Sequence, residues 1–279
     1  MATSLHLDVP GAIIHYIVQG SGPTLLLIPG ATGEHTVFED VAKQLSTYFM
    51  VVSYDRRGFS RSYLTAAQDY ANRLSTDVDD AKQLIQHVSK KPAFVLGNSS
   101  GAIVAIELLI QYPGVVERVF AHEAPLIQFH PEGAWWRDFF LKCYDKYVSS
   151  GVLLSARLFA EGIASGVEEA AGVAKVFDAR EGDFVGGNAM YWYERELRQY
   201  PCAVPNMEVL GQRADKLVLA GGRESSETSC YLPVNRVLAK RFRKKILEFP
   251  GSHGGYVTHP EEFARVMCAA ALGEARLGE

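Results

Sequence analysis

The pentapeptide Gly97–Gly101 holds a serine between two glycines in the pattern Gly-x-Ser-x-Gly. A short apolar run, Ala93–Leu96, precedes it, and a longer one, Ala102–Ile110, follows it. These lengths predict a buried strand that turns sharply into a buried helix. A serine on such a turn exposes its hydroxyl, and the helix N-terminus behind it offers N–H groups to an oxyanion. Ser99 is therefore the predicted nucleophile.

A serine hydroxyl needs a base within hydrogen-bond reach, and the base needs an acid that orients it. Among the eight histidines, only His253 lies in a glycine-flanked loop between the last predicted strand and the last predicted helix. Such a loop emerges at the same sheet edge as Ser99, so His253 is the predicted general base. No histidine pair has the spacing of zinc ligands, so we expect neither a metal nor a cofactor.

Two glutamates that follow predicted strands are candidates for the acid. Glu224 comes after the strand that begins near residue 216, where serine enzymes with the chain order serine, acid, histidine most often keep their acid. Glu123 comes after the strand that directly follows the serine turn and its helix. The ends of both strands can reach His253. The residues alone leave the choice between the two glutamates open.

Negative charge that develops on a substrate oxygen is stabilised by N–H groups that are fixed in advance. Ser100 directly follows the nucleophile and supplies one such group. The loop Pro29–Gly33 follows the continuous apolar strand Thr24–Ile28 and is expected to supply the other. The predicted donor in that loop is Ala31 or Gly30.

These groups must be positioned by a sheet, and predicted strands and helices alternate up to about residue 125. Parallel strands joined by helices bury such apolar runs economically. We predict an α/β fold with a mostly parallel central sheet and helices on both faces. Residues 1–125 and 214–279 form the two parts of its core. The charged segment Asp55–Gly58 is expected to shape the sheet edge through Arg–carboxylate bonds.

Residues 126–213 contain no strong strand pattern, and all three tryptophans fall there. This helix-like, aromatic-rich segment is the predicted cap, inserted over the carboxyl ends of the strands, where open α/β sheets bind ligands. Each cap aromatic has two interpretations, contact with the substrate or packing of the cap against the core. The candidates for substrate binding are Trp135, Trp136, Tyr191 and Trp192.

The composition excludes several classes of partner. Hydrophobic residues make up 48% of the 279 residues and charged residues 22%, which is ordinary for a globular protein in solution. A formal net charge of −4 gives no reason to expect nucleic acid or an anionic membrane. Neither a secretory signal nor a bilayer-spanning stretch is recognisable, so we expect a cytoplasmic enzyme with a small apolar substrate. A homodimer is left open.

Over nearly its whole length the chain resembles the α/β-hydrolase fold, and several motifs are similar to those of the fungal zearalenone lactonases. These motifs are Ser60–Ser62, Gly97–Ala102, Tyr112-Pro113, His122–Pro125 and Gly251–Ala264. The resemblance implies a serine hydrolase that opens a lactone or cleaves a carboxylic ester through an acyl-enzyme. The leading substrate it implies is a resorcylic macrolactone such as zearalenone. That family's acid falls on Glu123, and its oxyanion donors fall on Ala31 and Ser100.

Three alternatives share the same fold. A C–C bond hydrolase or a polyketide thioesterase would use the same serine, histidine and acid. A ligand receptor would keep these groups but turn over slowly, so a steady-state rate separates it from the enzymes. Epoxide hydrolases and haloalkane dehalogenases are disfavoured, because they need a carboxylate nucleophile and this chain has Ser99 at that position.

Overall fold

The computed structural model describes residues 2–164 and 166–273. Residues 1, 165 and 274–279, which belong to the predicted first core part, cap and second core part, lie outside the described residues. Nine strands form a single sheet in this part of the chain. In chain order they are β1 (Thr3–Val9), β2 (Ala12–Gln19), β3 (Thr24–Ile28), β4 (Met50–Tyr54), β5 (Tyr63–Leu64), β6 (Ala93–Asn98), β7 (Val116–His122), β8 (Leu217–Gly222) and β9 (Leu247–Phe249). Across the sheet the order is β1-β2-β4-β3-β6-β7-β8-β9, and β5 pairs with β2.

The sheet changes from antiparallel to parallel at β4. The pairs β1–β2 and β2–β4 are antiparallel, whereas every pair from β4 across to β9 is parallel. All five residues of β3 are buried, as expected for a strand covered on both faces. The register places Asn98 beside His122 and Gly222 beside Phe249, so the carboxyl ends of β6, β7, β8 and β9 meet at one edge.

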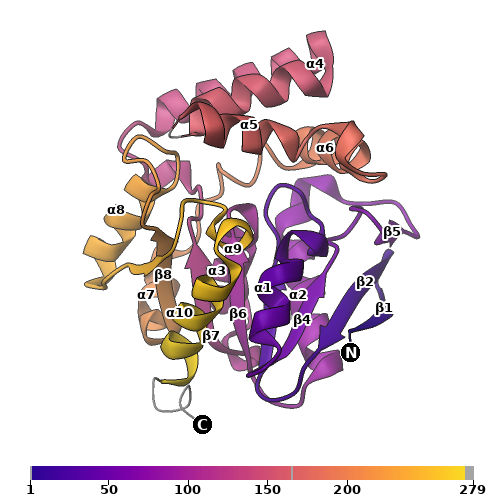
Figure 1. Cartoon of the computed structure of the whole chain (residues 1–279), viewed down its shortest axis with the longest axis vertical. Helices are drawn as coiled ribbons and strands as arrows, with labels where there is room; N and C mark the ends of the chain where they lie inside the picture. Colours follow the sequence, from indigo (N-terminus) through magenta and orange to yellow (C-terminus); the bar gives the residue numbers. More distant parts are fainter. Residues whose placement is uncertain (1, 165, 274–279) are drawn as a thin grey trace.

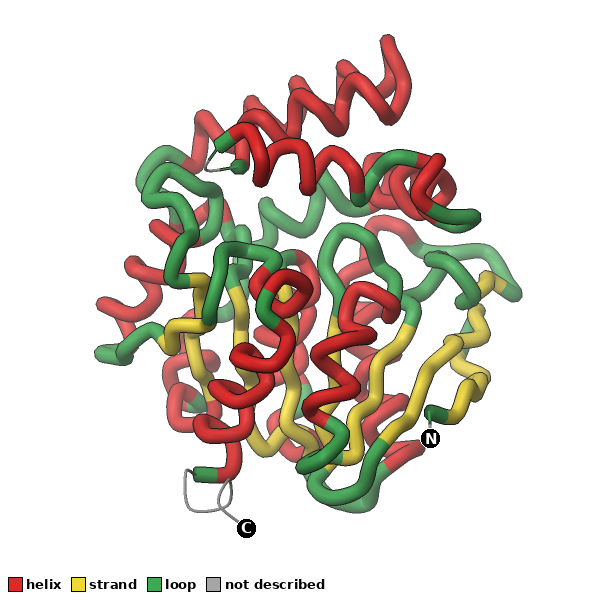
Figure 2. The backbone as a smooth tube through the Cα atoms, in the orientation of Figure 1, coloured by secondary structure: helices red, strands yellow, loops and turns green. Residues whose placement is uncertain are grey.

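Helices cover both faces of the sheet, as Figures 1 and 2 show. The α-helices among the described residues are α1 (Glu39–Leu45), α2 (Arg73–Val88), α3 (Ser100–Gln111), α4 (Gly133–Ile163), α5 (Val167–Lys175), α6 (Val185–Arg195), α7 (Met207–Gln212), α8 (Leu232–Phe242), α9 (Gly255–Thr258) and α10 (Pro260–Leu272). Within the described ranges, none of these helices is both long and apolar enough to cross a membrane.

Alternating residues of the strands separate the core into two layers. Leu26 and Ile28 of β3 pack with α2, α3 and α8, whereas Leu25 and Leu27 pack with α1 and α10. Neighbouring residues of a strand point to opposite faces, so these are two helical layers with the sheet between them. The predicted α/β-hydrolase fold, with a mostly parallel sheet and helices on both faces, is confirmed. The sequence analysis missed the two-residue strand β5, which is too short to show a pattern.

Between β7 and β8 the chain is largely helical, and α4, α5 and α6 lie together beyond one end of the strands (Figures 1 and 2). Buried side chains of α4 and α6, together with residues outside these helices such as Phe59 and Tyr231, form a third apolar cluster that is rich in aromatic rings, among them Phe140, Phe159 and Trp192. The long helix α4 bends at Gly151, where φ is 81°. We therefore propose that residues 126–213 form a cap over the core.

A buried network of ion pairs joins the helical segment, residues 126–213, to the sheet. Arg56, fully buried after β4, donates to Asp77 of α2 at 2.8 Å and to Glu196, directly after α6, at 2.6 Å. Arg73 of α2 donates to the other oxygen of Glu196 at 2.8 Å. The neighbouring Arg57 pairs with a carboxylate of α2 as well. The Arg–carboxylate bonds expected for this segment are therefore present, and one of them spans 140 residues of sequence.

Glu196→Ala is expected to lower the free energy of unfolding by about 3–5 kcal/mol, because it leaves two buried guanidinium groups without their shared carboxylate. Urea unfolding measures this loss. The control is Glu181→Ala, which removes a carboxylate that is exposed and paired with Lys175 at 3.3 Å. That variant is expected to lose less than about 1 kcal/mol. Equal losses in the two variants would show that the buried network contributes no more than a surface pair.

Candidate active site

Ser99 lies at the turn between β6 and α3, as the sequence predicted. Its backbone angles are φ 56° and ψ −124°, a conformation that is strained for a residue with a side chain. Within residues 95–106 every residue is buried except Ser99, which is half-buried. The turn needs glycine beside it, because a Cβ on Gly101 would lie 2.2 Å from the carbonyl oxygen of Ile28. The fold thus presents one accessible hydroxyl on a close-packed strand–helix turn.

His253 and Glu123 are joined by a hydrogen bond of 2.6 Å between Nδ1 and Oε2. Glu123 is fully buried at the end of β7, and its other oxygen accepts the backbone N–H of Gly222 at 2.9 Å. Burial alone would raise the pKa of Glu123, but the hydrogen bond from His253 and the nearby imidazoles outweigh it and hold that pKa below its usual value. Glu123 is therefore a buried carboxylate that fixes one edge of the imidazole.

Glu224, the alternative acid, lies on the exposed loop after β8. Its backbone N–H donates to the carbonyl of Gly251 at 3.0 Å, and its side chain lines the same cavity as His253. Among the described residues, no hydrogen bond or ion pair joins the carboxylate of Glu224 to His253. The geometry brings Glu123 to the histidine and leaves Glu224 at the rim of the cavity.

A second group of polar residues lies behind the histidine, and the sequence analysis missed it. The amide nitrogen of Asn98 lies 3.0 Å from Nδ1 of His122 and 3.2 Å from the carbonyl oxygen of His253. The amide oxygen accepts from the hydroxyl of Tyr256 at 3.1 Å. Burial lowers the pKa of His122 to about 4, so this imidazole is neutral and can accept from Asn98. The position of Asn98 just before the nucleophile was the available signal.

The predicted oxyanion donors lie next to Ser99. A Cβ built on Gly30 would lie 2.8 Å from Cβ of Ser99, which shows how closely the loop after β3 approaches the serine. The carbonyl of Gly30 accepts from Arg56 at 2.8 Å. Since a trans peptide directs its C=O and N–H oppositely, the N–H of Ala31 points away from that guanidinium. Ser100 is the first residue of α3, so its N–H has no partner within the helix.

Ser99, Ser100, Gly30, Ala31 and His253 line one cavity of about 570 Å³. The rest of its wall is predominantly apolar and comes from both the core and the helical segment. Apolar lining residues include Val37, Pro125, Phe140, Phe159, Ile163, Val173, Phe177, Trp192, Leu197 and Tyr231. The lining residues in the described ranges include Glu168 and Glu224 but no lysine or arginine. Such a cavity fits an apolar molecule without negative charge.

Of the four aromatic residues predicted to bind substrate, Trp192 lines this cavity, and the other three are not among the described lining residues. Trp135 is 55% exposed and stacks on Phe139, while Trp136 is buried in the aromatic cluster of the helical segment. Tyr191 faces the core, where its hydroxyl accepts from Arg73 at 2.7 Å. Of these three rings, Tyr191 packs the helical segment against the core, whereas Trp135 faces outward and Trp136 packs within the helical segment.

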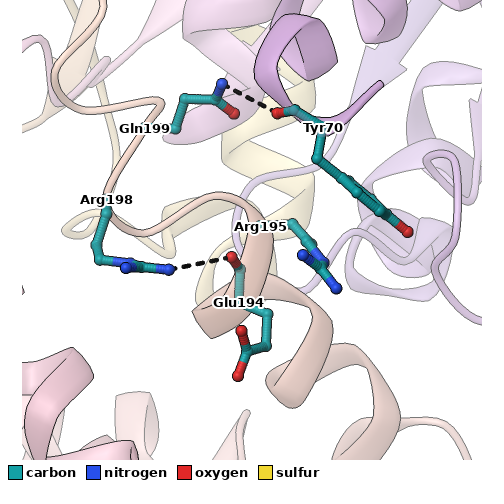
Figure 3. Close-up of a pocket in the computed structure, with 5 residues that line it drawn as sticks. All are labelled: Tyr70, Glu194, Arg195, Arg198 and Gln199. Carbon is teal, nitrogen blue, oxygen red and sulfur yellow. Dashed lines mark hydrogen bonds between the residues drawn. The ribbon is translucent and has the colours of Figure 1, made fainter. Parts of the chain in front are cut away.

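A smaller hollow of about 260 Å³ lies where the end of α6 meets the segment before α2 (Figure 3). It is lined by Tyr70, Glu194, Arg195, Arg198 and Gln199. The drawn side chains are largely engaged: Gln199 donates to the carbonyl of Tyr70 at 3.2 Å, and the Arg195 guanidinium lies 4.0 Å from the centre of the Tyr70 ring. None of these residues lines the cavity at Ser99, and they offer no nucleophile paired with a base.

Two groups in the described residues bring three potential metal ligands within 4.8 Å of one another. One is His122, Glu123 and His253. The other is His15, His35 and Asp55, where both histidines bond the carboxylate through Nδ1, at 3.0 Å and 2.7 Å. In the first group His253 bonds the carboxylate and in the second both histidines do, so hydrogen bonding accounts for the clustering.

A mostly parallel sheet covered by helices on both faces, with a serine on a strand–helix turn, is typical of the α/β hydrolases. Residues 25–266 match the alpha/beta hydrolase family, and the chain belongs to that family.

Two curated proteins and one solved structure are among those similar to the chain. The chain is 35% identical over 264 residues to the uncharacterized hydrolase YraK of Bacillus subtilis, covering 92% of each chain. It is 26% identical over 280 residues to a zearalenone hydrolase of Bionectria ochroleuca, covering 96% of this chain and 97% of that one. The enol-lactonase of Burkholderia xenovorans shares the fold, with a TM-score of 0.68 at 16% identity, over 94% of this chain and 98% of that one.

Proposed function

We propose that this protein is a serine hydrolase that opens a lactone, or cleaves a carboxylic ester, through an acyl-enzyme on Ser99. The observation that carries the proposal is the 2.6 Å bond between His253 and the buried Glu123, at the wall of the cavity that Ser99 also lines. A histidine held in this way keeps its Nε2 free to accept a proton.

In the proposed mechanism Ser99 attacks the carbonyl carbon while His253 takes the hydroxyl proton. Glu123 holds the imidazole in the tautomer with hydrogen on Nδ1 and stabilises the imidazolium that forms. The N–H groups of Ser100 and Ala31 stabilise the negative charge on the carbonyl oxygen. Collapse of the tetrahedral intermediate breaks the C–O bond, and His253 protonates the leaving alkoxide. Water, activated by His253, then releases the acid and restores the serine.

The proposed substrates are apolar and uncharged. A cavity of about 570 Å³ with an apolar wall and acidic residues at its rim favours a neutral lactone over an ester that carries a carboxylate. The likeness at 26% identity to a zearalenone hydrolase makes a resorcylic macrolactone such as zearalenone the leading candidate. The likeness to YraK is greater but names no substrate.

The test is steady-state hydrolysis of a panel with matched charges. The panel contains zearalenone, a γ-lactone, a p-nitrophenyl ester, an acyl thioester, and a second p-nitrophenyl ester that differs from the first by a terminal carboxylate. We expect turnover of the neutral lactone or ester, and a lower kcat/KM for the carboxylate-bearing ester because it meets the acidic rim.

The panel separates the alternatives. Turnover confined to the thioester would favour a thioesterase, and burst formation of one product equivalent without further turnover would favour a receptor. Absence of turnover on every lactone and ester would contradict the proposed activity.

A further inference from the structure

The ring of Tyr231 lies flat against the imidazole of His253. The two ring centroids are 4.1 Å apart, and the planes differ by 12°. Tyr231 is 3% exposed and directly precedes α8. The side-chain oxygen of Ser229 accepts the N–H of Leu232 at 3.1 Å, and the carbonyl of Tyr231 accepts the N–H of Asn235 at 3.0 Å. The ring is therefore carried by a well-anchored start of a helix.

The stacked tyrosine ring restricts a rotation of the imidazole that the hydrogen bond to Glu123 still allows. A single bond at Nδ1 fixes one atom of the imidazole but allows the ring plane to swing about it. Tyr231 covers one face and restricts that swing, so the two contacts together determine where Nε2 points. Because Tyr231 also belongs to the aromatic cluster that contains Phe159 and Trp192 of the helical segment, the plane of His253 is coupled to the packing of that segment.

The same contact has an electrostatic consequence. The face of a tyrosine ring is electron-rich and attracts a cation, so stacking favours an imidazolium over a neutral imidazole. Among the described residues, the titratable groups beside His253 include His122 at the end of β7, Glu123 directly after it, Tyr231 before α8 and the exposed Glu224, which lines the same cavity. Glu123 acts at the ring edge and His122 is neutral at its lowered pKa. Tyr231 acts on the ring face.

We propose that Tyr231 is a positioning residue: its ring fixes the plane of His253 and stabilises the imidazolium that forms when Ser99 loses its proton. The inference rests on the proposed function, in which Ser99 and His253 react together.

The experiment measures how fast a fluorophosphonate labels Ser99, as a function of pH, in wild type and two variants. Tyr231→Leu keeps apolar bulk but removes the ring, so we expect labelling to slow by about tenfold, within the range of a cation–π contact and lost positioning. The midpoint of the acidic limb should move to lower pH by about half a unit, because the charged imidazole loses stabilisation. Tyr231→Phe keeps the ring and should restore both values.

A matched control removes a different stacked tyrosine. Tyr193 stacks on Tyr147 with centroids 4.8 Å apart and planes 5° apart, within the aromatic cluster of the helical segment. Tyr193→Leu is expected to lower the melting temperature and leave the acidic midpoint unmoved. The inference is overturned when Tyr231→Leu labels at the wild-type rate with the wild-type midpoint, or when Tyr193→Leu moves the midpoint equally. Failure of wild type to label Ser99 at all would instead overturn the proposed function, and the inference with it.

Discussion

Ser99→Ala is expected to lower kcat by at least about 10⁴-fold on whichever lactone or ester the wild type hydrolyses. The reason is that the acyl-enzyme cannot form without the hydroxyl, while its surroundings stay in place. The turn is built by the close approach of Gly101 to β3 and by the helix that begins at Ser100, and neither depends on the serine oxygen. Alanine fits the same space, so we expect KM to change little although kcat falls steeply.

The measurement is steady-state kinetics beside thermal melting and substrate binding. Ser46→Ala serves as the control, because Ser46 is half-buried after α1 and its hydroxyl bonds only the carbonyl of Lys43, at 2.8 Å, among the described residues. That control should keep the wild-type kcat. A folded Ser99→Ala variant that retains a tenth or more of the wild-type kcat would exclude the acyl-enzyme mechanism.

The positions of the proposed nucleophile and the proposed base were predictable because each depends on local sequence. Gly97–Gly101 specifies a strand–helix turn through its glycines, and the loop at His253 is defined by the strand and helix on either side of it. The position of the proposed acid required one further step, the side-by-side pairing of β6 and β7, which places Asn98 beside His122 and so brings Glu123 to the same edge. The residues predicted both glutamates at that edge, and only coordinates distinguish a buried carboxylate from an exposed one.

The aromatic residues of the helical segment were less predictable, because a ring's role depends on the rotational phase of its helix. Trp135 and Trp136 are adjacent in sequence, yet about 100° of helical rotation separates their directions, and one is exposed while the other is buried. Tyr191 contacts Arg73, 118 residues away in sequence. Tyr231 stacks on His253, although α8 and β9 lie between them in the chain. No sequence pattern specifies contacts of this kind, since they arise from how whole elements pack.

Glu123→Gln and Glu224→Gln are expected to behave very differently, although both replace a glutamate near His253 with its amide. In the first variant the side chain keeps its shape, but it can turn its NH₂ toward Nδ1, which favours the wrong tautomer of the imidazole. A loss of about 10³–10⁴-fold in kcat is expected. Glu224 is exposed and, in the described part of the chain, has no bond to the imidazole, so kcat of Glu224→Gln should stay near the wild-type value.

Each glutamine variant is the control for the other, since both replace a glutamate with its amide. Melting curves show whether either variant has lost its fold. Neutralising Glu224 also removes a negative charge from the cavity rim. Its expected effect is therefore a lower KM for a carboxylate-bearing ester, with kcat unchanged. This split between KM and kcat is what distinguishes a rim carboxylate from a triad acid. If Glu224→Gln lost kcat and Glu123→Gln kept it, the acid would act from the loop after β8, and the 2.6 Å bond between His253 and Glu123 would be structural.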